Sequence, residues 1–122
     1  MKILAIGLVL SLVGCGTWYA PNRGVASVPC ASKADCDYKW SRAQVAVTKY
    51  SGYRIQLAND NVIETFGPTR SGSGLAYRVT KEVDRNGIGA IQIRALCNAT
   101  VYGCVEDPLV GAEGVAAYLR AG

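Results

Sequence analysis

The 122-residue chain contains no histidine, the side chain that most often transfers protons near neutral pH. It also lacks the G-x-S-x-G motif of a serine nucleophile. No two separated carboxylates lie in an obviously apolar stretch, where a general acid and base would be expected. We therefore expect a protein that is not an enzyme and that uses no cofactor.

Metal and nucleic-acid binding also have little support. No cysteine pair has the C-x2-C spacing of a zinc site, and the missing histidine removes the other common zinc ligand. The chain has 13 basic and nine acidic side chains, but the basic ones form no run. We expect no metal and no nucleic acid, although the mild positive charge suits anionic lipid or polymer.

No apolar run reaches the roughly 20 residues that a transmembrane helix needs. A shorter run, from Ile3 to Val13, follows the positive charge of Lys2 and has the length of a signal-peptide core. It ends in Leu12-Val13-Gly14-Cys15, with a small residue directly before a cysteine. This arrangement resembles the lipobox of bacterial lipoproteins, and the resemblance covers only the first sixteen residues. A secretory signal followed by an incidental cysteine is the alternative.

The resemblance implies that residues 1–14 are a signal peptide and that Cys15 carries the lipid. Several acyl chains on Cys15 would hold the protein firmly on a membrane. Gly16 is not a known retention residue, which implies the outer membrane of a Gram-negative cell, with the protein facing the periplasm. Removal of Lys2 lowers the net charge from +4 to about +3.

The rest of the chain divides into a linker and one small domain. Residues 15–32 contain two prolines, two glycines and no sustained hydrophobic period, so they are predicted to be a lipidated flexible tether. Residues 33–122 are long enough for a single envelope domain with a modest core.

Four cysteines remain besides Cys15: Cys30, Cys36, Cys97 and Cys104. An even number in an exported chain predicts two disulfides. Close spacing favours two short loops, Cys30–Cys36 and Cys97–Cys104, each worth about 2 kcal/mol on the chain-entropy estimate. A bond between the two clusters would close a longer loop, worth about 4 kcal/mol on the same estimate, and stays an open alternative.

Two segments have helical periodicity. The first runs from Tyr38 to Tyr50, is capped by Asp35 or Asp37 and ends at Ser51-Gly52. Trp40 in this helix is predicted to anchor it in the core rather than to stack on a ligand. The second helix follows Asp107-Pro108, a capping residue before a proline suited to the first turn.

Alternating patterns predict four strands between the helices, at residues 53–57, 62–66, 75–83 and 91–97. In the first of them, Ile55 and Leu57 are expected on one face. Turn signals at Asn59-Asp60-Asn61 and Asn86-Gly87 imply hairpins. The predicted fold is α+β: an N-terminal helix, a four-stranded antiparallel meander and a C-terminal helix, stapled by two disulfides. The helices should cover one face of the sheet and leave the other exposed.

The exposed face is predicted to carry one arginine on each of three strands: Arg54, Arg78 and Arg94, with Gln56, Thr80 and Gln92 as neighbours. The planar fork of arginine donors suits carboxylate and phosphate groups, so this set is a possible partner-binding site. The alternative is a solvated face on which the arginines pair with Glu64 and Glu82.

These features favour a noncatalytic envelope lipoprotein that docks on a protein or glycan partner. It is similar in size, anchor and α+β make-up to the small accessory lipoproteins of envelope assembly and secretion. The alternative function is a lipoprotein inhibitor of a host or competitor enzyme such as lysozyme. The net charge of the chain does not favour that alternative, because lysozymes are commonly basic and this chain is basic too.

Overall fold

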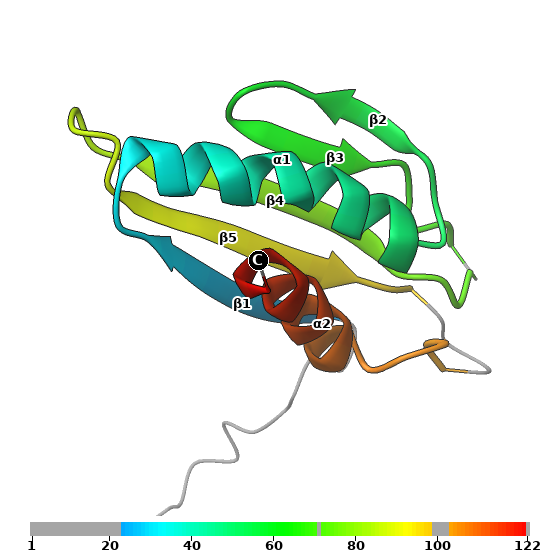
Figure 1. The fold of residues 1–122 in the computed structure, drawn as a ribbon. Helices are drawn as coiled ribbons and strands as arrows, with labels where there is room; N and C mark the ends of the chain where they lie inside the picture. Colours follow the sequence, from blue (N-terminus) through cyan, green and yellow to red (C-terminus); the bar gives the residue numbers. More distant parts are fainter. Residues whose placement is uncertain (1–22, 71, 99–102, 122) are drawn as a thin grey trace, which may run out of the picture.

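The computed structural model describes residues 23–70, 72–98 and 103–121. The elements, in chain order, are β1 (Arg23–Cys30), α1 (Lys33–Tyr50), β2 (Ile55–Ala58), β3 (Val62–Thr65), β4 (Ala76–Val83), β5 (Gly89–Leu96) and α2 (Pro108–Arg120). The strands lie in the order β1-β5-β4-β3-β2, and all neighbours are antiparallel. Both helices cover the same face of the sheet (Figure 1). The predicted α+β class is therefore confirmed.

The sheet has five strands rather than the predicted four, and the first described element is a strand rather than a helix. The additional strand, β1, lies in the segment predicted to be a tether, and it pairs with β5 along its whole length. Pro29 is tolerated because β1 is an edge strand. The tether prediction is wrong for residues 23–30, whereas residues 15–22 and the predicted signal peptide 1–14 lie outside the described residues.

A close approach between β1 and α2 explains a glycine in this strand. Gly24 is buried, and a Cβ atom at this position would overlap with backbone atoms of Pro108 and Leu109. The start of β1 and the start of α2 are therefore held side by side, along the lower side of the molecule in Figure 1.

The start of α1 is fixed by two reciprocal hydrogen bonds, five residues before the predicted start. The backbone N–H of Asp35 donates to Ser32 Oγ at 3.1 Å, and the N–H of Ala31 donates to Asp35 Oδ2 at 2.9 Å. This second bond, together with the ammonium group of Lys39, lowers the pKa of the Asp35 carboxyl. The predicted end of the helix at Ser51 is confirmed.

The strands β2 to β5 form the predicted meander, with one irregularity. Ile55 pairs with Thr65 but Leu57 pairs with Glu64, so the register shifts between them. Ile55 therefore faces the helices, whereas Leu57 lies on the opposite face and is 44% exposed. The prediction that these two side chains share a face is wrong because the bulge reverses the alternation.

The core lies between the sheet and the two helices. Trp40 packs at its margin, where its indole N–H donates to the carbonyl of Asn59 at 3.0 Å, so the predicted anchoring role is confirmed. Arg42 joins the helices: its guanidinium lies 4.3 Å from the ring centroid of Tyr118. Tyr77 is fully buried, and burial raises the pKa of its phenol.

Two disulfides staple the domain, in the favoured short-loop pairing. Cys30–Cys36 joins the end of β1 to the first turns of α1, and Cys97–Cys104 joins the end of β5 to the segment before α2. Within the described residues, neither helix is long and apolar enough to cross a membrane.

Candidate functional site: the open face of the sheet

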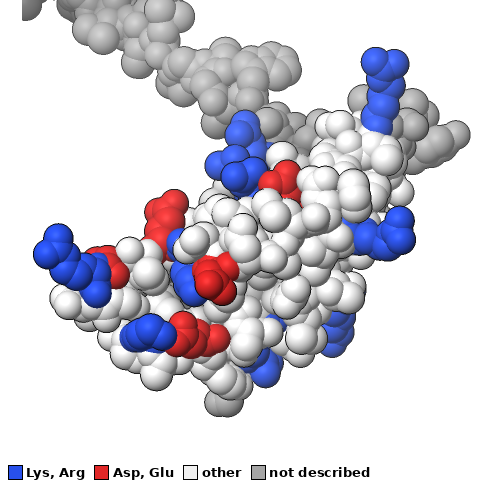
Figure 2. Space-filling view, turned by 90° about the horizontal axis from the view of Figure 1, so that it is seen from above, with Lys and Arg blue, Asp and Glu red and all other residues white. Residues whose placement is uncertain are grey.

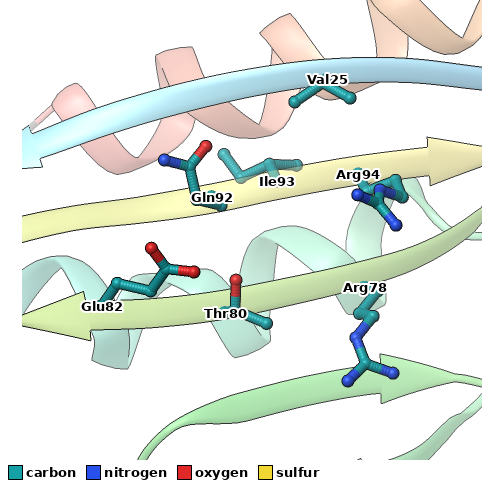
Figure 3. A pocket seen from close by; sticks show the side chains of 7 residues that line it. All are labelled: Val25, Arg78, Thr80, Glu82, Gln92, Ile93 and Arg94. Carbon is teal, nitrogen blue, oxygen red and sulfur yellow. The ribbon is translucent and has the colours of Figure 1, made fainter.

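The face of the sheet opposite the helices is not covered by any element of the described chain. Figure 3 looks onto this face with the helices behind the strands. A shallow hollow of about 460 Å³ lies on it, spanning β1, β5 and β4. Its lining residues are Val25, Arg78, Thr80, Glu82, Gln92, Ile93 and Arg94. We call this region the arginine hollow.

The two arginines of the hollow are direct partners on neighbouring strands. Arg78 of β4 lies opposite Arg94 of β5 in the register of the sheet. The row continues on both sides, with Val25 beside Arg94 and Glu64 beside Arg78. Two basic side chains therefore lie together in the middle of a row that has one acidic side chain, on β3.

Only one of the two arginines has a partner of opposite charge among the described residues. Arg78 Nη1 lies 2.9 Å from Glu64 Oε2, in a pair whose side chains are 49% and 31% exposed. Glu64 also accepts a hydrogen bond from Gln56. The alternative prediction, an ion pair with Glu64, is thus confirmed for Arg78. Arg94 is exposed and forms no ion pair within the described part of the chain.

The charges of the arginine hollow are unevenly distributed. Arg78 and Arg94 lie toward one end, Glu82 lies toward the other, and Thr80 and Gln92 are register partners between them (Figure 3). Like charges directly opposite each other on adjacent strands destabilise a sheet. An anionic group bound between the arginines would remove this repulsion and receive planar, paired donors.

The structure does not bring Arg54 into this site. Arg54 directly precedes β2, where its carbonyl accepts a hydrogen bond from the backbone N–H of Phe66. It lines a separate hollow between the end of α1 and the start of β2. The predicted three-arginine surface is therefore reduced to Arg78 and Arg94. Val25 was missed because β1 was not expected to be a strand.

The structure describes four of the five other predicted site residues. Cys30, Cys36, Cys97 and Cys104 form the two disulfides, and Cys15 lies outside the described residues. In the described ranges, no group of three or more histidine, cysteine or carboxylate side chains is placed to hold a metal ion.

Comparisons of the chain with protein-family models, with curated proteins and with solved structures found no match. What the arginine hollow does is therefore inferred from its own residues.

Proposed function

We propose that this chain is a noncatalytic, lipid-anchored protein of the bacterial outer membrane that docks on an acidic partner through the arginine hollow. The observation that carries the proposal is the pairing of Arg78 with Arg94, where Arg94 forms no ion pair within the described chain. A partner carboxylate or phosphate would supply the missing negative charge.

The hollow has the composition of a docking surface rather than of a catalytic cleft. A guanidinium group has five hydrogen-bond donors and no acceptor, so the two arginines are suited to hold an anion. Thr80 and Gln92 add neutral hydrogen-bonding groups, and Val25, which is 50% exposed, adds apolar surface. Arginine is enriched at protein interfaces relative to the rest of the protein surface. Envelope glycans also carry carboxylates and phosphates, so both partner classes fit.

The proposed anchor is a short stretch of chain away from the domain. β1 begins at Arg23, eight residues after Cys15, and eight extended residues span at most about 29 Å. Lipid on Cys15 would therefore keep the domain close to the membrane surface, where envelope partners are concentrated. An inhibitor of lysozyme has weaker support, because the exposed arginines would meet a basic enzyme with like charge.

The test is capture of envelope components by the purified full chain. Two probes are used separately, detergent-solubilised envelope proteins and peptidoglycan sacculi, each at low and high salt. We expect Arg78→Gln with Arg94→Gln to lower capture of one probe about tenfold, and wild-type capture to fall as salt rises.

The control is Arg70→Gln with Arg85→Gln, which removes the same charge from two exposed arginines outside the hollow. This control variant should capture each probe to the same extent as the wild type. Equal capture by the wild type and the hollow variant, with both probes, would show that the face is only solvated.

A further inference from the structure

The two edges of the sheet differ in whether another strand can reach them. At the β1 edge, Arg120 Nη2 donates to the carbonyl of Ser27 at 3.1 Å, and Lys39 Nζ donates to the carbonyl of Pro29 at 2.9 Å. These side chains occupy backbone acceptors that an added strand would need, and Pro29 has no N–H to offer. The β1 edge is therefore blocked.

The β2 edge is open. Phe66 donates to the carbonyl of Arg54, and Asn59 donates to the carbonyl of Val62, so these positions of the strand point inward to β3. Because inward and outward positions alternate in an antiparallel ladder, the peptide groups of Ile55 and Ala58 point away from the sheet. No side chain of the described residues forms a hydrogen bond with either of them.

The inner side of β2 is also incompletely covered. Strands lie about 4.8 Å apart and packed helices about 10 Å apart, so two helices cover roughly four strands. β2 is the fifth, and a trough of three adjoining hollows runs between it and α1. In the middle of the trough Val45 is 53% exposed and Ile55 is half-buried. This edge therefore offers apolar surface as well as backbone groups.

The charges at the two ends of β2 are opposite. Arg54 directly precedes the strand, Asp60 follows it in the turn to β3, and both are exposed. Neither forms an ion pair within the described ranges. Figure 2 views the molecule from the side on which Figure 1 shows β2. In this view the acidic side chains gather toward one side, and the charged side chains at the other side are all basic. A strand with one charge of each sign at its ends is complementary to an antiparallel copy of itself.

We propose that β2 pairs antiparallel with β2 of a second copy of this chain across a twofold axis, joining two five-stranded sheets into one. Ile55 of each copy would exchange backbone hydrogen bonds with Ala58 of the other copy, and Arg54 would lie near Asp60 of the other copy. Such an interface is isologous, so each contact occurs twice. The exposed Leu57 would lie beside the axis, and both arginine hollows would stay open.

The first experiment is cross-linking in cells that produce the full chain. Leu57→Cys is treated with a short bismaleimide, and Leu109→Cys is the control because Leu109 of α2 is similarly exposed, 49% against 44%. We expect a cross-linked dimer from Leu57→Cys and none from Leu109→Cys, because only residues near the twofold axis lie within about 8 Å of their copies. Equal cross-linking from Leu109→Cys would contradict the proposal.

The second experiment reverses the charges in the Leu57→Cys background. In a dimer of Arg54→Asp, or of Asp60→Arg, both contacts between position 54 of one copy and position 60 of the other join like charges. Each single variant should therefore lower the dimer yield about tenfold. Two differently tagged copies, one with each change, should form mixed dimers at the wild-type yield, because every contact is then attractive. The same recovery is expected from both changes in one chain, which also controls for misfolding of either single variant.

Two results would overturn the proposal. One is a dimer yield that does not depend on these charges. The other is cross-linking of Leu57→Cys to a different protein without self-cross-linking, which would show that the open edge receives a partner strand instead.

Discussion

Arg78 and Arg94 are direct partners across β4 and β5, and an acidic side chain, Glu64, lies on only one flank of the pair. A sheet selected only for stability would not place two like charges opposite each other. Under the proposed function, a bound anionic group would complete the charge of this surface. Folding and binding should therefore respond differently to changes at this pair.

Removing one of the two charges should not harm the fold. Arg94→Gln relieves the repulsion with Arg78, so we expect the melting temperature to stay constant or to rise by about 2–4 °C. Thermal unfolding followed by circular dichroism measures this. A decrease of several degrees would mean that Arg94 is a structural residue with a partner of its own.

The anchor is tested by Cys15→Ser. Without the acceptor cysteine, we expect the protein to leave the membrane fraction or to persist as an unprocessed precursor. Fractionation and mobility on a denaturing gel distinguish these outcomes. If the variant fractionates and migrates as the wild type does, Cys15 is not lipidated.

Each staple should contribute a similar amount to stability. Cys97→Ser with Cys104→Ser, or the equivalent change at Cys30 and Cys36, should lower the free energy of unfolding by about 2 kcal/mol. Non-reducing peptide mapping of the wild type should recover the two short-loop linkages. A peptide that joins one cluster to the other would contradict the pairing.

The start of α1 should be sensitive to acid. Because the folded-state pKa of Asp35 is lowered, its carboxylate stabilises the fold above its unfolded pKa near pH 4, and this contribution disappears as the pH falls through the lower folded value. Melting temperatures of the wild type and Asp35→Asn should therefore differ at neutral pH and converge in acid.

Ser32→Ala provides the comparison, because a hydroxyl does not titrate in this range. Loss of this cap should cost about 1 kcal/mol at neutral and acidic pH alike. A constant difference between Asp35→Asn and the wild type down to strongly acidic pH would refute the role given to the carboxylate.

The elements with strong local signals were predictable from the sequence. Asp107-Pro108 marks the start of α2, and the alternating patterns with turn residues between them mark the meander. β1 was not predictable in this way, because its buried side uses small residues, Gly24 and Ala26 among them, and its partner β5 lies far along the chain. An edge strand also tolerates the proline that suggested a tether.

The candidate site was predictable where the alternation is regular. Arg78 and Arg94 lie in strands without interruption, so their shared face followed from a period of two. Arg54 did not, because it precedes β2, the outer strand separated from β4 by β3, and it lines the hollow beside the end of α1 instead. The face of Leu57 was not predictable either, because a bulge depends on how two strands pair and the sequence of one strand does not show it.

The most direct test of the docking face is photo-cross-linking of the full chain in the cell envelope, with a photo-reactive amino acid in place of Gln92. Gln92 lines the arginine hollow, and Glu113, exposed on the helical side, is the control position. We predict an adduct with an envelope component from position 92 that is absent from position 113 and is lost when Arg94→Gln is added. No adduct at position 92, or the same adduct from both positions, would contradict the account.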